Sequence, residues 1–399
     1  MKYIIVLADG MADFKVPELG NKTPMEYAYC PNMNYLARNG QVGRMKTIYE
    51  NLPVGSIVAN MAILGFNPYK YYPQGRASFE ALAQGIQLNK NDMALRCNLI
   101  SINEGLRITD FTSGNISDGH AKNIVSHLKI NNHSFRIFPG QSYRNLLILR
   151  DISIHPNELK FFEPHCNIGR SIHEILPKAL SEKSKPLADE LSDFMLDTIS
   201  QIKELNKRFK TKADMIWFWS PSSMPNLPSF AEKFKINGSI VAAMDFLKGI
   251  GVSAQMDFED IPDTNGYIDT NYENKLSYAK KMLLDNDLVY IHINAPDEEG
   301  HNRNPHLKAK SIEYIDNRIL GPLMIHLREQ YQDDFRIAVL PDHYTAVKDG
   351  QHYGIDVPFL LYGKDILPDQ IVDFSEESAE RSDFKLISYN FMEYFLNIK

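Results

Sequence analysis

Residues 1–10 read MKYIIVLADG, and the fold class follows from this segment more directly than from any other. Six apolar residues, Tyr3–Ala8, run without interruption to a carboxylate, Asp9. A short run that is apolar at every position predicts a strand buried on both faces, as in a parallel sheet covered by helices. Ligands bind such sheets at the carboxyl ends of the strands. The sequence therefore predicts an α/β core whose functional residues follow its strands.

Similar apolar runs recur toward the C-terminus. They are Met215–Trp219, Ser239–Ala243, Leu288–Ile293, Arg336–Leu340 and Pro358–Tyr362. Helical patterns lie between several of them, at Met244–Gly249, Tyr272–Leu284 and Leu307–Tyr331. Strands that alternate with helices predict a mostly parallel sheet with helices on both faces.

The middle of the chain has a different pattern. Its strand-like runs are Met93–Ile102, Leu106–Phe111, Ser134–Phe138 and Asn145–Leu149, with few helical patterns between them. This pattern predicts a smaller α+β insertion. A charged and periodic segment follows, Lys178–Lys212, which predicts a long exposed helix that returns to the main sheet.

Composition narrows the function classes. The 399 residues are 44% apolar and 23% charged, as in ordinary globular proteins, and carry a formal net charge of −7. That charge argues against nucleic-acid binding, which needs a basic face. The three cysteines form no CxxC motif. We find no signal peptide and no apolar stretch long enough for a membrane helix, so we expect a cytoplasmic protein without membrane partners. The oligomeric state stays open.

Acidic and histidine side chains stand just after the predicted strands. They are Asp9, Asp297, His301, Asp342, His343 and His352. A parallel sheet would bring them to one edge, and Asp and neutral His are ligands of divalent ions such as Mn²⁺ and Zn²⁺. Each one alone has an ordinary interpretation, because an Asp after a strand commonly caps a helix and a surface His commonly faces solvent. All six together favour a site for two ions.

One shared site requires the first and last thirds of the chain to form one domain. We therefore expect a discontinuous core of residues 1–89 and 180–399, and an inserted, substrate-covering domain of residues 90–179.

A loop at residues 51–65, NLPVGSIVANMAILG, supplies a candidate nucleophile. Pro53 and Gly55 break the chain, and an apolar helical pattern follows Ser56. A serine at a helix start faces free N–H groups that favour an anion. Ser56 is interpreted either as a helix cap or as a nucleophile whose hydroxyl is activated by a metal ion.

Ordered motifs carry a resemblance along nearly the whole chain. They are LADGMAD (7–13), NKTPMEYAYCPNMNYLARNG (21–40), PVGSIVAN (53–60), LGFNP (64–68), GRASFEA (75–81), APDEEGH (295–301), LPDHYT (340–345) and QHYGIDVPFLLYG (351–363). The chain resembles the archaeal-type cofactor-independent phosphoglycerate mutases of the alkaline phosphatase superfamily. The resemblance implies an alkaline-phosphatase-like α/β core with an inserted smaller α+β domain, two divalent metals and a phosphoserine intermediate. It also implies that the substrate is a small phosphorylated metabolite and that 2,3-bisphosphoglycerate is not needed.

The resemblance also implies residue roles. Asp9, Ser56, Asp342 and His343 match the ligands of the metal that activates the nucleophile, Ser56, while Asp297, His301 and His352 match those of the other metal. Mn²⁺ is the expected ion, with Mg²⁺, Zn²⁺ or Co²⁺ as alternatives. The expected substrate-binding residues are Arg76, Arg96, Arg144, His165 and Lys248. For each arginine a surface ion pair is the ordinary alternative.

Several positions depart from the family pattern. Ile57 and Cys166 stand where GSD and PHD motifs have aspartate, and Ala77-Ser78 stand where the family often has Gly-Pro or Ser-Pro after the arginine. All expected metal ligands are kept, so phosphoryl transfer follows more firmly than the substrate.

Three other functions compete. Segments 110–117 (DFTSGNIS) and 138–144 (FPGQSYR) resemble those of proposed homoserine kinases in this family, although the chain has no GxxxxGK[ST] motif. A metal-dependent phosphatase and a binding protein without catalytic activity are the remaining alternatives.

Overall fold

The chain divides into two compact units. A computed structural model describes residues 1–397. One unit comprises Met1–Tyr72 and the chain from Asn226 onward, and the other comprises Pro73–Pro225. These boundaries lie outside the expected ones at 89/90 and 179/180. The reason is that α5 (Ala77–Ala83) packs on strands β3 (Met93–Ile102) and β9 (Met215–Ser223), and α8 (Lys185–Phe209) packs on β9.

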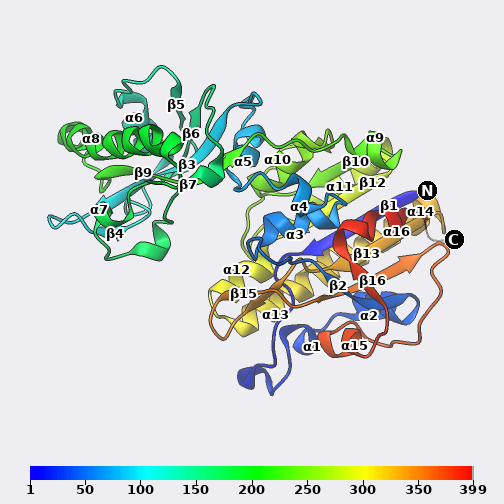
Figure 1. Cartoon of the computed structure of the whole chain (residues 1–399). Helices are drawn as coiled ribbons and strands as arrows, with labels where there is room; N and C mark the ends of the chain where they lie inside the picture. Colours follow the sequence, from blue (N-terminus) through cyan, green and yellow to red (C-terminus); the bar gives the residue numbers. More distant parts are fainter. Residues whose placement is uncertain (398–399) are drawn as a thin grey trace. The chain divides into compact units, whose positions relative to one another are not determined.

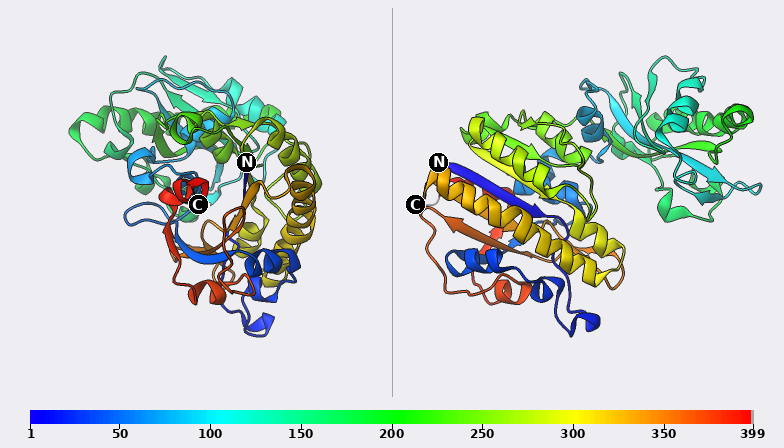
Figure 2. Two further views of the ribbon diagram at one scale, coloured as in Figure 1. Left: turned by 90° about the vertical axis from the view of Figure 1, so that its right-hand side faces the viewer. Right: turned by 180° about the vertical axis from the view of Figure 1, so that it is seen from behind.

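An eight-stranded sheet forms the centre of the first unit, in the order β11-β10-β12-β1-β13-β16-β2-β17. The strands are β11 (Asp257–Phe258), β10 (Gly238–Val241), β12 (Leu288–Ile293), β1 (Lys2–Ala8), β13 (Phe335–Leu340), β16 (Val357–Gly363), β2 (Gln41–Lys46) and β17 (Lys385–Ile387). Neighbouring strands pair in parallel except that β16 runs antiparallel to β13 and β2. Helices lie on both faces (Figures 1 and 2). The predicted α/β fold with a mostly parallel sheet is confirmed.

The helices of this unit follow its strands closely. They are α1 (Pro24–Tyr27), α2 (Pro31–Arg38), α3 (Ser56–Ile63), α4 (Pro68–Tyr71), α9 (Phe230–Phe234), α10 (Asp245–Ser253), α11 (Tyr272–Asp285), α12 (Ala295–His301), α13 (Pro305–Tyr314), α14 (Gly321–Tyr331), α15 (Glu376–Glu380) and α16 (Phe391–Asn397). The helix expected over Leu307–Tyr331 is interrupted, because the π-helical segment η5 (Ile315–Leu320) separates α13 from α14. A π-helical turn changes the periodicity, so one apolar pattern does not continue through it.

Strand register brings the predicted site residues to one edge. Ala8 of β1 pairs with Ile293 of β12, and Leu7 pairs with Leu340 of β13. All six residues of β12 and of β13 are buried, as the apolar pattern predicted. The three parallel strands therefore end side by side, and the segments after them start from the same edge of the sheet.

The second unit holds a separate five-stranded antiparallel sheet. Its order is β4-β3-β6-β5 with β9 beside β3, where β4 is Ile108–Asp110, β6 is Arg144–Leu149 and β5 is Phe135–Phe138. Two short helices, α6 (Asp118–His127) and α7 (Ile172–Ile175), and the strand pair β7 (Leu159–Lys160) and β8 (Lys178–Ala179) complete it. The α+β character expected of the insertion agrees with this arrangement.

Strand β9 corrects the assignment of the run Met215–Trp219, which we expected in the main sheet. It pairs with β3 instead. Its side chains on one face pack with α8, and α5 also contacts it. An apolar run indicates burial on both faces but does not indicate which sheet the strand joins.

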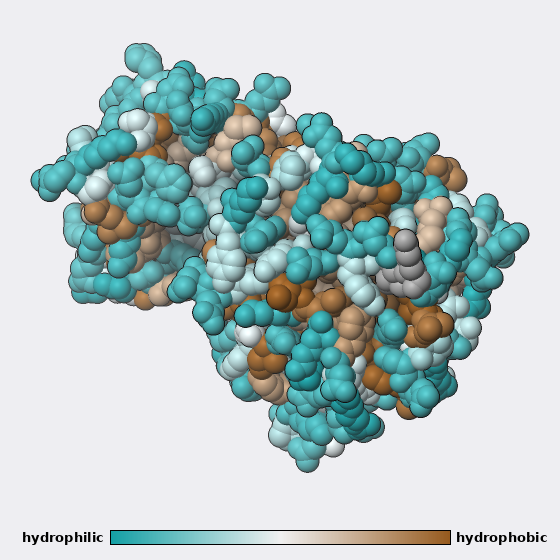
Figure 3. All heavy atoms as spheres, turned by 45° about the vertical axis from the view of Figure 1, so that its right-hand side comes forward, coloured by the Kyte–Doolittle hydropathy of each residue, from teal (hydrophilic) through white to brown (hydrophobic). Residues whose placement is uncertain are grey.

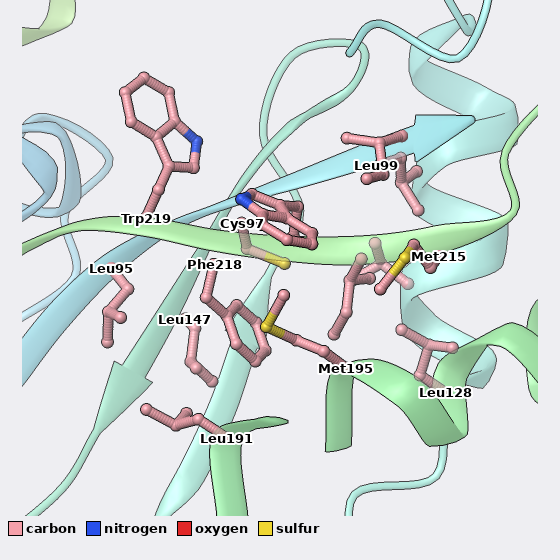
Figure 4. Close-up of a cluster of buried hydrophobic side chains, with 14 of the residues drawn as sticks. Leu95, Cys97, Leu99, Leu128, Leu147, Leu191, Met195, Met215, Phe218 and Trp219 are labelled. Atoms are coloured by element: carbon pink, nitrogen blue, oxygen red, sulfur yellow. The ribbon is translucent and has the colours of Figure 1, made fainter. Parts of the chain in front are cut away.

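A hydrophobic core lies between this sheet and α8 (Figure 4). Leu191 and Met195 of α8 point toward Phe218 of β9, and all three are buried. Trp219 points to the opposite side of the sheet, as the alternation along a strand requires. Helix α8 is therefore half-buried in the second unit and does not return to the main sheet.

On the face shown in Figure 3, hydrophilic side chains cover most of the surface and hydrophobic ones lie in small separate groups. Scattered exposed apolar residues of this kind are normal on a protein surface. Within residues 1–397, none of the helices is both long enough and apolar enough to cross a bilayer.

Candidate active site

Three of the predicted ligands form a buried cluster where β1 and β13 end. Ligand atoms of Asp9, Asp342 and His343 lie within 4.8 Å of one another, and all three side chains are buried. Ser56 joins them from helix α3. Its hydroxyl donates to Oδ1 of Asp9 at 3.4 Å and lies 3.1 Å from Nε2 of His343. The structure therefore brings together the residues expected at the first metal.

Ser56 is the first residue of α3 and not its cap. Gly55 holds the cap position and has extended backbone, and the helix start has no side-chain cap. The Ser56 hydroxyl faces the cluster instead, so the helix-cap interpretation does not apply. The free N–H groups of the first helical turn favour negative charge beside this oxygen.

A second cluster contains the other three ligands. Ligand atoms of Asp297, His301 and His352 lie within 4.8 Å of one another. Asp297 and His301 lie on α12, and His352 lies on β15 (Gln351–Tyr353), which pairs with β14 (Tyr344–Ala346). Nδ1 of His301 lies 2.8 Å from the carbonyl oxygen of Gly350. A carbonyl only accepts hydrogen bonds, so Nδ1 carries the proton and Nε2 is left as a ligand atom.

The two clusters adjoin each other through Thr345. Its hydroxyl donates to Oδ1 of Asp297 at 2.5 Å and lies 3.1 Å from Nδ1 of His343. The rings of His343 and His352 pack at an interplanar angle of 31°, with centroids 3.9 Å apart. One hydroxyl therefore orients a ligand in each cluster, and the clusters form one continuous site.

The pKa values of the site residues are shifted in directions that suit the binding of cations. Burial, together with the carboxylates of Asp342 and Asp297, raises the pKa of Asp9 well above its ordinary value. Burial opposes ionisation of Asp297, but hydrogen bonds with His301 and His352 outweigh it and hold the pKa of Asp297 well below normal. Burial also lowers the pKa of His343, which keeps that imidazole neutral. Carboxylates crowded in a buried site beside imidazole nitrogens fit divalent cations.

Two further side chains hold the first cluster, and sequence reasoning missed both. The Asn60 amide donates to Oδ2 of Asp342 at 2.9 Å and to the carbonyl oxygen of Ser56 at 2.7 Å. Nε2 of His292 lies 3.0 Å from Oδ2 of Asp9. Asn60 stands four residues after Ser56, on the same face of α3, so helical spacing was a usable signal. His292 lies inside an apolar strand and gave none.

Replacement of Thr345 tests its bridging role. Thr345→Val keeps the shape but removes the hydroxyl that orients His343 and Asp297, so we expect divalent-metal affinity to fall by about 10–100-fold. Thr345→Ser keeps the hydroxyl and is the matched control. The measurement is Mn²⁺ binding by calorimetry, and equal affinity in the valine and serine variants would contradict the bridging role.

Gly10 tests how closely the backbone approaches the second cluster. Its φ is +60°, and an added Cβ would collide with Oγ1 of Thr345 and lie 2.6 Å from Oδ1 of Asp297. We expect Gly10→Ala to displace Asp297 and to lower both Mn²⁺ affinity and thermal stability. Gly20→Ala is the matched control, because Gly20 has φ +69° but nothing within 4 Å of the added Cβ. Backbone strain alone costs about 1 kcal/mol at such positions, so comparable Mn²⁺ affinity in the two variants would refute the steric account.

Four predicted substrate-binding residues gather in the second unit. Arg96 is buried on β3, and its guanidinium lies 4.4 Å from the ring centroid of Trp219. Nε of Arg96 and Nε of Arg76 lie 3.1 Å and 3.0 Å from separate oxygens of Glu80. Burial, with Arg76 nearby, lowers the pKa of Arg96 to about 10, which still leaves it charged at neutral pH. The charges nearby include more guanidinium groups than carboxylates, which suits an anion.

His165 and Arg144 border this group. The His165 ring packs at 5.4 Å from Trp219 and 5.9 Å from Phe111, centroid to centroid. Arg144 pairs with Asn98 across β3 and β6 and lies over Tyr143. Sequence reasoning missed Glu80, which holds both arginines, although it stands in the GRASFEA motif.

Lys248 does not join the other predicted substrate-binding residues. It lies on α10 in the first unit, and its Nζ forms an ion pair with Asp260 at 2.6 Å. The sequence around Lys248 did not indicate that its side chain would pair with Asp260.

A serine hydroxyl beside two adjoining carboxylate–histidine clusters, on an α/β sheet, is the arrangement typical of metal-dependent phosphoryl-transfer enzymes. Comparison with known proteins gives the family. A family model described as 2,3-bisphosphoglycerate-independent phosphoglycerate mutase matches residues 37–206. A protein of that name from Methanosarcina barkeri is 39% identical over 394 residues, which cover 97% of each chain.

Solved structures agree in fold. The PH0037 protein from Pyrococcus horikoshii has a TM-score of 0.81 at 25% identity, with 100% of this chain and 97% of that chain covered. Cofactor-independent phosphoglycerate mutase from Thermoplasma acidophilum has a TM-score of 0.66 at 24% identity, with both chains covered completely. The chain belongs to the 2,3-bisphosphoglycerate-independent phosphoglycerate mutase family. The resemblance stated from the sequence motifs is confirmed.

Proposed function

We propose that this enzyme interconverts 3-phosphoglycerate and 2-phosphoglycerate through a phosphoserine at Ser56, with two divalent ions. One observation carries the proposal: the Ser56 hydroxyl lies within hydrogen-bonding distance of Asp9 and His343, next to the second cluster. A hydroxyl in contact with metal-ligating groups is placed to lose its proton. The family named above supports the choice of substrate.

The residues present fit two ions. Asp9, Ser56, Asp342 and His343 would hold one ion, and Asp297, His301 and His352 the other. When bound, the two ions supply Lewis-acid stabilisation of the charge on the attacking and leaving oxygens. Three ionised carboxylates carry −3 and two divalent ions carry +4, so the loaded site has a net charge of +1 that attracts a phosphate. We propose Mn²⁺ as the ion, with Mg²⁺, Zn²⁺ or Co²⁺ as alternatives.

The chain's own residues account for the rest of the chemistry. Ser56 Oγ attacks phosphorus, the bond from phosphorus to the substrate oxygen breaks, and the Ser56 proton ends on that oxygen, which leaves as an alcohol. The freed glycerate then attacks the phosphoserine with its other hydroxyl, which breaks the Oγ–phosphorus bond and restores Ser56. Reversal by the same groups makes the enzyme a mutase, provided that glycerate and not water accepts the phosphoryl group.

The basic group of the second unit, Arg76, Arg96, Arg144 and His165, is proposed to bind the carboxylate or phosphate of the substrate. Guanidinium forks match both anions. Lys248 is already paired with Asp260, so its proposed role requires that this exposed pair opens.

A kinase function receives no added support from the segments that suggested it. Asp110 accepts hydrogen bonds from the backbone of Thr112 and Gly114, and Ser142 bonds to Ile116 and Asp118. These contacts shape two loops that pack together. Asp110 and Ser142 are therefore used within the loops, which gives these two residues a structural explanation.

The deciding experiment is a set of paired assays on one Mn²⁺-loaded preparation. Interconversion of 3- and 2-phosphoglycerate, ATP-dependent phosphorylation of homoserine, and release of inorganic phosphate are each measured. We expect interconversion without ATP and with little phosphate release. Activity that depends on ATP would establish the kinase instead, and phosphate release as the main product would establish a phosphatase.

Arg96 gives a test of substrate binding. Arg96→Lys keeps a positive charge but removes the planar fork, and a charge-assisted hydrogen bond contributes about 1.5–3 kcal/mol, so KM should rise by roughly 10–100-fold. Arg150→Lys is the matched control, because Arg150 pairs with Asp92 elsewhere in the same unit. Steady-state kinetics separate KM from kcat. A fall in kcat with KM unchanged would argue against a binding role.

A further inference from the structure

A third group of metal-ligating side chains lies in the second unit, apart from the two clusters already described. It is formed by Glu163, His165 and Cys166, at the start of the short helix η3 (His165–Asn167). Their ligand atoms lie within 4.8 Å of one another, and all three side chains are exposed. Because the side chains are exposed, a cation can reach them from solvent.

The separations between the ligand atoms match one coordination geometry. Oε2 of Glu163 lies 3.3 Å from Sγ of Cys166 and 3.5 Å from Nε2 of His165. In a tetrahedral Zn²⁺ site, bonds of ~2.0–2.3 Å place neighbouring ligand atoms about 3.4–3.6 Å apart. The carboxylate oxygen thus already lies at tetrahedral separations from the sulfur and from the nitrogen, and the sulfur and nitrogen lie within 4.8 Å of each other.

The surroundings hold the histidine in place. The imidazole packs edge-on against Trp219 and Phe111, at 5.4 Å and 5.9 Å between ring centroids. Burial and the nearby Arg96 lower the pKa of His165, although Glu163 opposes this, so its imidazole is neutral at neutral pH and has a lone pair to offer. The thiol of Cys166 donates to Glu163. A metal ion replaces that proton: the thiol and a divalent ion give a metal thiolate and one released proton.

From this geometry we infer that Glu163, His165 and Cys166 form a third metal site, which binds a thiophilic divalent ion such as Zn²⁺ and thereby inhibits the enzyme. The site combines one sulfur, one nitrogen and one oxygen, a set that favours Zn²⁺ over Mn²⁺ or Mg²⁺. An ion on Nε2 of His165 removes that atom from substrate binding. This inhibition rests on the proposed function, whereas metal binding does not.

Cobalt absorption tests the site without any assay of turnover. The Asp/His clusters contain no sulfur, and Cys30 and Cys97 are buried. A charge-transfer band between thiolate and Co²⁺ therefore reports the proposed site alone. We expect the full-length protein to show this band once the added Co²⁺ exceeds the two equivalents that the Asp/His clusters take up, and Cys166→Ser to lack it. Cys30→Ala is the matched control and should keep it. No band in the natural protein, or a band that persists in Cys166→Ser, would overturn the inference.

A second variant removes a ligand without touching the thiol. Glu163→Gln should keep the band but weaken Co²⁺ binding by about tenfold or more, because one charged ligand is lost. Unchanged affinity would show that Glu163 is not a ligand.

Zinc titration of the Mn²⁺-loaded enzyme tests the inhibition. We expect Zn²⁺ to raise KM in the natural protein at a concentration about tenfold lower than in Cys166→Ser, since the variant keeps only two ligands. Zinc that displaced Mn²⁺ from the Asp/His clusters would act equally on both proteins and would overturn the inhibitory role. If the chain proved not to be a mutase, the cobalt band would still appear, so the two failures are distinguishable.

Discussion

Ser56→Ala should abolish interconversion of 3- and 2-phosphoglycerate, with a loss of about 10⁴-fold or more in turnover. Removal of an enzyme's nucleophile commonly costs this much, because the chemistry has no other acceptor for the transferred group. Here the hydroxyl oxygen within hydrogen-bonding distance of both Asp9 and His343 is Oγ of Ser56. The measurement is turnover with 3-phosphoglycerate and Mn²⁺.

The covalent step has a direct readout. Acid quenching of the natural enzyme during turnover should trap a peptide that contains Ser56 with one added phosphoryl group, detectable by mass spectrometry. The alanine variant should show none. Full turnover by Ser56→Ala, or a phosphoryl group on another residue, would falsify the phosphoserine scheme.

A second serine separates loss of chemistry from loss of stability. Ser375 caps α15 and accepts a hydrogen bond from the backbone N–H of Ser378 at 3.1 Å, whereas Ser56 caps no helix. Ser375→Ala should therefore lower stability by about 1 kcal/mol and leave turnover unchanged. Ser56→Ala should do the reverse, with thermal stability close to that of the natural protein.

The sequence predicted the central strands because they are apolar at every position. Tyr3–Ala8 and Leu288–Ile293 correspond to strands whose residues are largely or wholly buried. Because these strands are parallel and adjacent, the acidic residues after them had to meet at one edge. The structure places Asp9, Asp297 and Asp342 there, which is why a one-dimensional pattern was enough to find the site.

Two kinds of strand were harder to predict: strands that contain polar residues, and apolar strands that belong to the second sheet. β2 reads QVGRMK and lies between β16 and β17. Its Arg44 and Lys46 interrupt the apolar pattern, so the sequence did not indicate a strand. β9 is as apolar as the main-sheet strands but pairs with β3, since helices pack on it in the second unit. The sequence of a strand indicates whether the strand is buried, but it does not indicate which strand it pairs with.

Roles that depend on a partner distant in sequence were also missed. Glu80 holds two arginines, and Thr345 connects the two clusters. Both stand inside recognisable motifs and each contacts a near neighbour, Arg76 or His343. The second partner, Arg96 or Asp297, lies farther along the chain. Lys248 shows the opposite error, because a basic residue chosen by type proved to be paired with Asp260.

Asp9→Asn should have opposite effects on the metal-free and metal-loaded protein. Burial and the carboxylates of Asp342 and Asp297 raise the pKa of Asp9 well above its ordinary value. Without metal, the folded state therefore binds a proton more tightly than the unfolded state does. Stability then falls as pH rises through the window between the unfolded and folded pKa values, since ionising Asp9 places another negative charge in the cluster.

The uncharged side-chain amide of Asp9→Asn removes the destabilisation that results from ionising Asp9 in the metal-free protein. Asparagine keeps an oxygen that can accept from His292 but carries no charge, so metal-free Asp9→Asn should melt at a higher temperature than the metal-free natural protein at neutral pH. Its stability should also depend less on pH. Thermal melting in the presence of a chelator, across about pH 6 to pH 8, measures both effects.

With Mn²⁺ the order should reverse. The natural protein gains stability by binding the ion, in proportion to the logarithm of metal concentration over its dissociation constant. The variant has lost one of the carboxylates of the first cluster, and even residues that only orient ligands change affinity by about 10–100-fold, so its gain in stability from Mn²⁺ and its turnover should be far smaller.

Asp316→Asn is the matched control: Asp316 is buried with a raised pKa, but it accepts hydrogen bonds from Met33 and Asn32, away from both clusters. That variant should keep the full Mn²⁺ stabilisation. If Asp9→Asn gained as much from Mn²⁺ as the natural protein does, Asp9 would not be a ligand. The negative charge of Asp9, which destabilises the metal-free protein, would then have no function in holding the ion.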